Sequence, residues 1–369
     1  MGSIAQEFTA PEIVELSGSP REIGFEHGRR LAPKIHSQIQ VYTAMFKSTS
    51  KLDWPAVRRI AEEYSSTIAQ LTPELHNEIT GIAQGAGLDV LDIVALNARS
   101  EIALGLFEDG CTSVGWKTEN EGVFLSQNWD WTARVKSNLA MMSIEQEGKP
   151  KIWMVTEAGI VGKIGVNSAS VGTCLNAIRA KPCDSSKLPI HIALRLCLEA
   201  TSAKAAIAKL ESLGGTASAQ HILIADLADP ISLELSPLGD IHLHPNEKGI
   251  ICHTNHFIEN RLVNEPPWLA GSPIRLDRAR LLMDEIAEGI KVGEKKLTAE
   301  TLRKEVFSDL FNAPQAICCQ EDPVRPIETR STTLFNIVMR FREGEKPSAE
   351  VVWGRPGSGE EGPILRMPW

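Results

Sequence analysis

The sequence predicts an α+β protein in which β-sheets are covered by helices. Residues 1–105 are mostly helical in pattern, and at Cys111 the pattern changes to short β-rich runs separated by turns. Helical and β-rich stretches alternate from there to the C-terminus, with no repeat, low-complexity tract or long linker. Strand runs flanked by helical runs are typical of layered α+β domains.

The N-terminal part is expected to begin with a short strand over 12–17 and to continue as helices. The stretch SPRE at 19–22 has the capping-box pattern, with serine as the cap, proline in the first turn and glutamate three residues after the cap. Two further helices are predicted at Asp53 and Thr72, where a cap residue is followed closely by proline. A fourth helix is expected over 90–104.

The rest of the chain is expected to alternate between strands and helices. Strands are predicted within 111–116, 122–131, 139–148, 151–159, 162–178, 221–227, 231–237, 240–245, 249–256, 332–341 and 348–354. One long helix is predicted over 189–215, where Gly214 and Gly215 supply the stop signal. Further helices are expected between 273 and 309.

Composition narrows the class of protein. The chain has 369 residues, 43% of them apolar and 23% charged, as in soluble globular proteins. Its net charge is −9 without any basic run, which argues against nucleic acid or an anionic membrane as a partner. No apolar run approaches the roughly 20 residues of a membrane span. The first residues lack a secretory signal and a complete myristoylation pattern. Seven scattered cysteines favour a reducing compartment, so a cytoplasmic location is expected.

Familiar cofactor and metal motifs are missing from the sequence. It contains no phosphate-loop pattern, no GxSxG elbow and no HExxH. His242 and His244 could present two imidazoles on one face of a strand, but no third ligand stands at metal spacing, so a solvent-facing role is favoured. Cys318 and Cys319 are expected to be core thiols. Neither a resident cofactor nor a metal is predicted.

Cys111 is the residue whose position suggests chemistry. It stands where the helical part changes to the β-rich part, directly after Gly110. A cut before Cys111 would create a free α-amine, with a pKa near 8, that can act as base for the thiol of the same residue. Gly110 favours such a cut because it has no Cβ to hinder attack on its carbonyl. Taken alone, a cysteine such as Cys111 is most often a packed core thiol, and Asp109-Gly110 could be an ordinary turn.

Nine short motifs follow one another along nearly the whole chain. They are REIGFEHG, LNARSEI, DGCT, SQNWDW, TEAGIVGKIGVNSASVG, HIALRLCLEATS, LELSP, HTNH and RSTTLFNI. In this order and spacing they resemble the isopenicillin N acyltransferase family of N-terminal nucleophile enzymes. The resemblance implies a four-layer αββα fold, made as a precursor that cuts itself between Gly110 and Cys111. Residues 1–110 would form a mostly helical small fragment that stays associated with the catalytic part, 111–369.

The resemblance also implies the catalytic residues. Cys111 would be the nucleophile through its thiol and the general base through its new α-amine. Asp130 in NWDW and Arg330 in TRSTT match the family's acidic and basic residues, a pair expected to orient the nucleophile and fix charge near the amine. Asn255 in HTNH matches the side chain that donates to the oxyanion. Taken one at a time, these residues could be ordinary turn or surface residues.

Two further positions are implied for processing. Ser236 in ELSP matches a serine needed for maturation, together with Gly110 and Cys111 at the scissile bond. Thr329 stands where the penicillin-forming enzymes have serine, so the hydroxyl is kept and a methyl is added. The chain also ends in LRMPW rather than the peroxisomal tripeptide of those enzymes, which puts the pathway in doubt but not the chemistry.

The function expected from the resemblance is a self-processing cysteine acyltransferase. It would form or exchange an amide through a Cys111 thioester, with a small-molecule acyl donor and an amine acceptor as partners and acyl-CoA as a candidate co-substrate. A hydrolase of N-acyl amides with the same fold, similar to choloylglycine hydrolases and ceramidases, is the alternative. A processed but inactive binding protein is less favoured, because every reactive position of the family pattern is filled.

Overall fold

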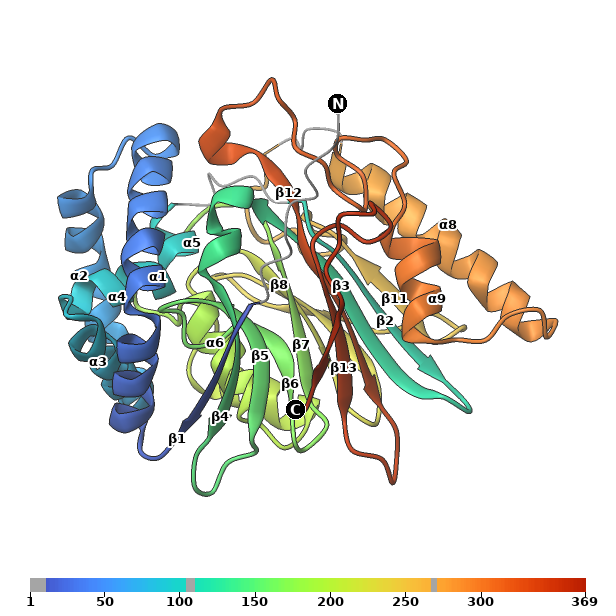
Figure 1. Cartoon of the computed structure of the whole chain (residues 1–369), viewed down its shortest axis with the longest axis horizontal. Helices are drawn as coiled ribbons and strands as arrows, with labels where there is room; N and C mark the ends of the chain where they lie inside the picture. The colour runs from blue at the N-terminus through green and yellow to red at the C-terminus, as the bar shows by residue number, and fades with distance from the viewer. Residues whose placement is uncertain (1–10, 104–109, 267–270) are drawn as a thin grey trace.

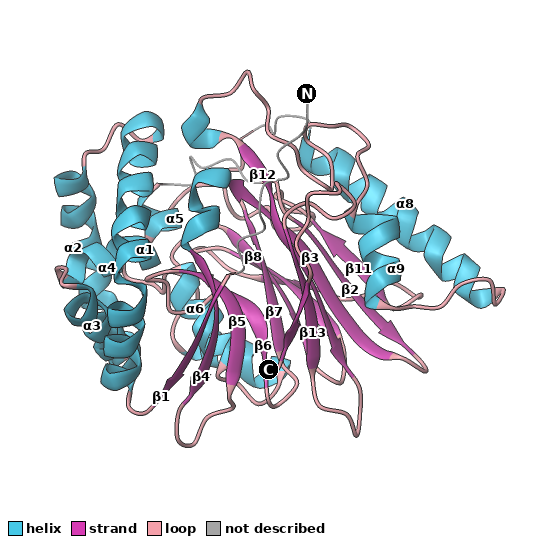
Figure 2. Ribbon diagram, viewed as in Figure 1, coloured by secondary structure: helices cyan, strands magenta, loops and turns pink. Residues whose placement is uncertain are grey.

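The computed structural model describes residues 11–103, 110–266 and 271–369 (Figure 1). Helices lie on both sides of a central pair of β-sheets (Figure 2). The predicted turn residue Asp109 and the last residue of the helix expected over 90–104 lie outside the described part.

Two sheets form the centre of the molecule. The first sheet has the order β1 (Glu12–Ser17), β4 (Leu139–Glu145), β5 (Ile152–Glu157), β6 (Ile164–Asn167), β7 (Gly172–Ala177), β8 (Gln220–Ala225), β9 (Pro230–Leu235) and β10 (Ile241–Leu243). The second has the order β11 (Ile250–His253), β2 (Thr112–Thr118), β3 (Gly122–Thr132), β12 (Ser331–Phe341), β13 (Ser348–Trp353) and β14 (Ile364–Met367). Neighbouring strands are antiparallel within these described elements, except for the parallel pair of β1 and β4.

Helices cover the outer faces of both sheets. The longer ones are α1 (Pro20–Thr49), α2 (Trp54–Leu71), α3 (Pro73–Ala86), α4 (Val90–Asn97), α6 (Ile190–Leu198), α7 (Ala203–Ser212) and α8 (Gly271–Lys291). The shorter ones are α5 (Arg99–Ile102), α9 (Ala299–Leu302), a π-helical turn (Arg303–Phe307) and two 3₁₀ turns (Ala133–Asn138 and Ile327–Thr329).

The packing of these elements makes four layers. Helix α6 packs on β6, β7 and β8 of the first sheet, and α8 packs on β2 and β11 of the second. Between them, β2 and β3 face β7, β8 and β9 across the inter-sheet core. The predicted α+β class and αββα layering are therefore confirmed. No helix in the described ranges is long and apolar enough to cross a membrane.

Helix α1 begins as predicted and packs closely on α3. Ser19 caps it in a capping box with Glu22, and the helix continues past Pro33 without ending. Four glycines bring the two helix backbones together, with Gly24 and Gly28 on α1 facing α3 and Gly81 and Gly85 on α3 facing α1. A Cβ on Gly24 would lie 2.0 Å from the carbonyl oxygen of Glu78, a separation that no real contact reaches.

Gly24→Ala is therefore expected to lower the free energy of unfolding by about 1–3 kcal/mol, because the two helices must move apart. The urea midpoint measures this. Gly289→Ala is the matched control, since it is also a helical glycine but its Cβ would meet only the side chain of Lys295. This control should be neutral or slightly stabilising. Equal midpoints for both variants would contradict the close-packing argument.

Two predicted helices are interrupted in the structure. The helix expected over 90–104 breaks after α4, because Asn97 donates both to Ile93 O (2.9 Å) and to Gly159 O (2.8 Å) of a distant turn. The long helix expected over 189–215 is wrong as a single element. Its middle is opened by Asn167, which donates to Leu198 O at 2.8 Å and to Ala200 O at 2.7 Å.

Helix starts follow the predicted caps with one difference. The side chain of Asp53 caps α2 by accepting the N–H of Ala56 at 2.9 Å. Thr72 precedes α3 as expected, but its hydroxyl donates to Ile68 O at 3.1 Å and makes no capping bond. The proline at the first position of α3 already removes one of the backbone donors that a cap would satisfy.

A buried carboxylate joins the N-terminal helices to the first sheet. Glu157 at the end of β5 pairs with Arg99 (2.8 Å) and Lys163 (2.6 Å). Tyr42 also donates to it at 2.5 Å, as does Gln38 from the same helix. Burial alone would raise the pKa of Glu157, but Arg99 and Lys163 hold it well below its usual value. Two of the quoted motifs, LNARSEI and TEAGIVGKIGVNSASVG, thus meet in one structural cluster.

The tryptophans of NWDW belong to the same cluster. Successive side chains of a strand point to opposite faces, so Trp129 and Trp131 share one face of β3 and Asp130 lies on the other. The Lys163 ammonium lies 3.9 Å from the ring centroid of Trp129, and the Arg99 guanidinium lies 5.0 Å from that of Trp131. These cation–π contacts hold β3 so that Asp130 faces away from the inter-sheet core.

Candidate active site

Cys111 lies immediately before β2, at one end of the second sheet, and is fully buried. Its Sγ accepts the backbone N–H of Asp130 at 3.3 Å and is 3.6 Å from the carbonyl oxygen of the same residue. The pairing of Thr112 with Asn128 places these two strand ends side by side. The first two predicted site residues are therefore in contact.

The Asp130 carboxylate is held by the neighbouring strand. Thr333 lies opposite it in the β3–β12 register, and its hydroxyl donates to Asp130 Oδ1 at 2.6 Å. The register shifts directly after Thr333, a β-bulge that increases the local twist. A Cβ on Gly110 would lie 3.0 Å from Asp130 Oδ2 and 3.5 Å from the Sγ of Cys319. Close approach to the carboxylate is thus a second reason for glycine at position 110.

The carbonyl group of Cys111 is anchored by two side chains. Asn176, near the end of β7, donates to it at 3.0 Å. Arg275, in the first turns of α8, donates to it at 2.6 Å through Nη1. The start of β2 is therefore fixed by contacts from the first sheet and from an outer helix.

Asn255 is held in the loop that follows β11. Its amide nitrogen donates to Ala177 O at 2.9 Å, and its Oδ1 accepts from Arg275 Nη2 at 2.9 Å. Its backbone N–H donates to Ser272 Oγ at 2.8 Å. An amide nitrogen carries two hydrogens, and these described contacts use one of them.

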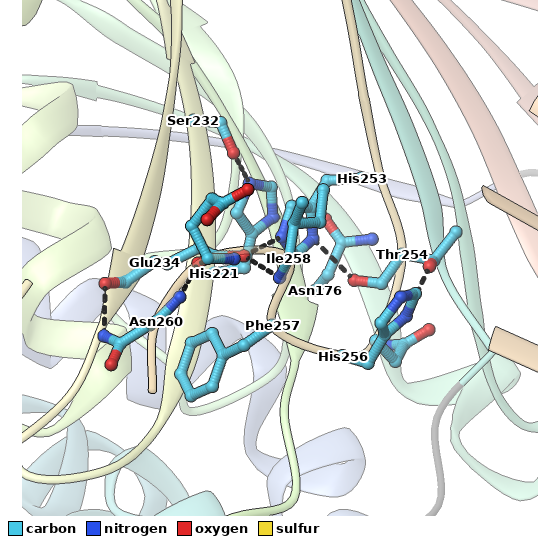
Figure 3. A network of polar contacts seen from close by, with 12 residues as sticks. Asn176, His221, Ser232, Glu234, His253, Thr254, His256, Phe257, Ile258 and Asn260 are labelled. Carbon is cyan, nitrogen blue, oxygen red and sulfur yellow. Dashed lines mark hydrogen bonds and ion pairs between the residues drawn. The ribbon is translucent and has the colours of Figure 1, made fainter. Parts of the chain in front are cut away.

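The remaining residues of HTNH hold this loop in place (Figure 3). His253 contacts Glu234 Oε1 at 3.0 Å and Thr254 O at 2.9 Å, so both of its ring nitrogens face oxygen atoms. Glu234 also accepts the backbone N–H groups of Ile258, Glu259 and Asn260. Burial alone would raise the pKa of Glu234, but these hydrogen bonds lower it.

A second histidine stacks on His253 and reaches Asn176. The rings of His221 and His253 lie 3.5 Å apart and nearly parallel. His221 Nδ1 contacts Asn176 Oδ1 at 2.9 Å, and its Nε2 contacts Ser232 Oγ at 2.7 Å. Burial and His253 hold the pKa of His221 well below its usual value, so the ring is neutral. Since Asn176 Oδ1 is an acceptor, the proton lies on Nδ1 of His221.

Arg330 and Thr329 lie in the segment before β12, away from these contacts. The Arg330 guanidinium donates to Arg325 O at 2.7 Å and to Pro323 O at 2.8 Å. Within the part of the chain that the structure describes, Asp130 is contacted by Thr333 rather than by Arg330. The expected Asp130–Arg330 pair is thus not formed in this structure. The Thr329 hydroxyl donates to Pro326 O at 3.2 Å, within a 3₁₀ turn.

Ser236 lies in the turn after β9. Its hydroxyl donates to Gly239 O at 2.6 Å, and its N–H donates to Asp240 Oδ1 at 3.0 Å. Asn260 donates to the same Gly239 oxygen at 3.0 Å, which links this turn to the loop that follows Asn255. The local contacts are those of a turn residue, and a role in maturation stays a prediction.

Three residues of the site were missed by the sequence analysis. Thr333 and Asn176 lie inside or beside quoted motifs, but nothing in those motifs marks them as partners of Asp130 and Cys111. Arg275 lies outside every motif and reaches Cys111 from 164 positions away. In the described ranges, no group of three or more His, Cys, Asp or Glu residues could hold a metal ion.

Comparison with known proteins identifies the family. Residues 116–350 match the family model described as acyl-coenzyme A:6-aminopenicillanic acid acyl-transferase. The 40 kDa form of acyl-coenzyme A:6-aminopenicillanic-acid-acyltransferase from Emericella nidulans is 36% identical over 352 residues, which cover 94% of this chain and 94% of that protein. The chain belongs to the acyl-coenzyme A:6-aminopenicillanic acid acyl-transferase family. The predicted family and the predicted acyltransferase class of enzyme are therefore confirmed.

Two solved structures show a weaker likeness to this member of the acyl-transferase family. A mutant of the conjugated bile acid hydrolase from Clostridium perfringens aligns with a TM-score of 0.47 at 13% identity, over 70% of this chain and 92% of that one. Penicillin V acylase from Agrobacterium tumefaciens aligns with a TM-score of 0.46 at 17% identity, over 66% and 83%.

Proposed function

We propose that this chain cuts itself between Gly110 and Cys111 and then acts as an N-terminal cysteine acyltransferase. The observation that carries the proposal is that Cys111, Asp130 and Asn255 meet at one buried end of the second sheet. There Cys111 Sγ contacts the Asp130 backbone, and Arg275 bonds both Cys111 O and Asn255 Oδ1. Residues 1–110 remain bound after the cut through buried contacts such as those of Glu157. The partners are a small-molecule acyl donor, an amine acceptor and the protein's own N-terminal fragment.

Self-cleavage begins with attack of the Cys111 sulfur on the carbonyl carbon of Gly110. A carbon–sulfur bond forms, the Gly110–Cys111 amide bond breaks, and the departing nitrogen keeps the thiol proton as part of the new amine. Water then hydrolyses the thioester, which releases the Gly110 carboxylate and restores the thiol. The Asp130 carboxylate beside Gly110 fits a role in moving the proton from sulfur to nitrogen. Ser236 and Thr329 are proposed to assist this maturation indirectly, through the turns they hold.

The mature reaction uses the same thiol with a different base. The α-amine of Cys111 accepts the thiol proton while sulfur attacks the acyl donor, and that proton passes to the leaving thiol or amine. Asn255 donates its second amide hydrogen to the developing oxyanion. The acyl-enzyme thioester is then resolved by an amine, which gives a new amide, or by water, which gives a free acid. Arg330 is proposed to join the site electrostatically in the cut enzyme.

Asn255→Ala is expected to lower kcat about 10²- to 10³-fold with little change in KM, because the lost donor acts on the transition state. The assay must use protein shown by intact mass to be cut. Ser272→Ala is a useful comparison, since it removes a contact to the Asn255 backbone and leaves the amide in place. An unchanged kcat for Asn255→Ala would make Asn255 a structural residue.

The acyl donor and acceptor follow from the family. We expect the cut enzyme to accept phenylacetyl-CoA or a medium-chain acyl-CoA and to release free CoA. Water competes for the thioester at high concentration, so transfer requires a bound and oriented amine. Adding 6-aminopenicillanic acid should divert part of the acyl group into a new amide, measured by mass spectrometry of the products. Free acid alone across a broad panel of amines would instead favour the N-acyl amide hydrolase.

The cytoplasm is the proposed location. The seven cysteines all lie in the described ranges and form no disulfide there, which fits a reducing compartment. Fractionation of the source cells followed by detection of residues 111–369 tests this location, and recovery with a membrane or organelle pellet would contradict it.

A further inference from the structure

One guanidinium connects the nucleophile residue to the oxyanion donor. Arg275 is 97% buried, on the face of α8 that packs against β2 and β11. Its Nη1 donates to Cys111 O at 2.6 Å and to Thr112 Oγ1 at 3.1 Å, and its Nη2 donates to Asn255 Oδ1 at 2.9 Å. Each of these acceptors comes from a segment more than 15 positions away in the sequence.

The chemistry of these contacts determines which way the Asn255 amide points. A guanidinium has only donors, so the oxygen of the amide must face it and the nitrogen must face the opposite side. A flipped amide would bring its N–H₂ group against the Nη2 of Arg275 and its oxygen against the oxygen of Ala177. Both contacts would be repulsive, and a buried polar group that is left unsatisfied is destabilising.

The shape of the Arg275 guanidinium also links the Cys111 and Asn255 oxygens. The guanidinium is rigid and planar, so the separation between Nη1 and Nη2 is constant. Cys111 O and Asn255 Oδ1 are therefore both bonded to one rigid group, a link that neither the β2 strand nor the loop after β11 would provide alone. Asn176 contacts the same Cys111 oxygen but makes no described contact with Asn255.

We infer that Arg275 is a positioning residue, which aligns the Cys111 nucleophile with the Asn255 amide during acyl transfer. It acts through these two residues and is not assigned a contact with the substrate. The inference rests on the proposed function, because the alignment matters only if Cys111 forms an acyl-enzyme. It adds to that function a group that orients the oxyanion donor.

The test compares three variants, Arg275→Lys, Arg275→Met and Arg278→Met. Each is assayed as the cut enzyme with both fragments present and with phenylacetyl-CoA as donor. Lysine keeps the charge but offers one nitrogen, which cannot span both acceptors as the fork does. We expect both Arg275 variants to lose about 10- to 100-fold in kcat with KM changed less than about 3-fold. Arg278 is the matched control, because it lies on the same helix but pairs with Asp309 at 2.7 Å. Its variant should keep the wild-type kcat.

Each result either supports or contradicts the positioning role of Arg275. Arg275→Lys with a wild-type kcat would show that charge alone suffices and would overturn the positioning role. A rise in KM with kcat unchanged would also overturn it, by making Arg275 a binding residue. If Arg275→Met is not cut, its kcat cannot be measured, and the half-time of self-cleavage is compared between the variants and wild-type protein instead. A wild-type half-time for Arg275→Lys would then overturn the inference. Failure of the proposed function is distinct, because wild-type protein would then itself remain uncut or inactive.

Discussion

Cys111→Ala is expected to give one uncut chain with no turnover of acyl-CoA. Without the sulfur there is no atom to attack the Gly110 carbonyl, and without the cut there is no α-amine to act as base. The fold should survive, because the described contacts of the sulfur, two hydrogen bonds with the backbone of Asp130, contribute little to stability. Intact mass should show a single species, where wild-type protein gives fragments 1–110 and 111–369.

Cys319→Ala is the matched control for this prediction. Its sulfur lies 3.5 Å from the position that a Cβ on Gly110 would take, so it is a second thiol close to the scissile bond. We expect this variant to be cut and to keep kcat within about 3-fold of wild type. A Cys111→Ala chain that is still cut after residue 110, or wild-type protein that stays whole yet active, would overturn the mechanism.

Glu157→Ala is expected to lower the free energy of unfolding by about 3–5 kcal/mol. The variant leaves Arg99 and Lys163 buried without their carboxylate, and it removes the acceptor used by Tyr42. Urea unfolding should be measured in the uncut Cys111→Ala background, where one chain folds and unfolds. Glu145→Ala is the control, because its ion pair with Lys151 is exposed and should contribute less than about 1 kcal/mol.

The pH dependence of stability gives this prediction a second test. The folded-state pKa of Glu157 lies below its usual value of 4.5, so its contribution is present above about pH 4.5 and is lost as the pH falls through the folded pKa. The difference in free energy of unfolding between the wild-type protein and the Glu157→Gln variant should therefore be constant from pH 7 to about pH 5 and shrink at lower pH. A difference that grows on acidification would mean that the carboxylate is not ionised in the folded protein.

Much of the site could be predicted from motifs that are short and contiguous. Cys111, Asp130 and Asn255 each lie within one motif, and the structure brings all three to the same end of the second sheet. The predicted partnership of Asp130 with Arg330 was not met, because the strand register places Thr333 opposite Asp130 while Arg330 contacts carbonyls of its own loop. Sequence order alone does not reveal such a register.

Features that depend on neighbouring residues could be predicted without the structure. Helix starts at Ser19 and Asp53 follow from side chains that bond the backbone three residues away, and the change of pattern at Cys111 follows from local periodicity. The change from helical to β-rich secondary structure could therefore be predicted without tertiary information.

Contacts between groups that are distant in the sequence depend on the complete fold. Asn167 interrupts a predicted helix from another strand, and Glu157 gathers cations and a phenol from three separate segments. Arg275 reaches Cys111 and Asn255 from a helix that carries no motif. A buried polar group must find its partner wherever packing brings one, and that choice is made by the whole fold rather than by adjacent residues.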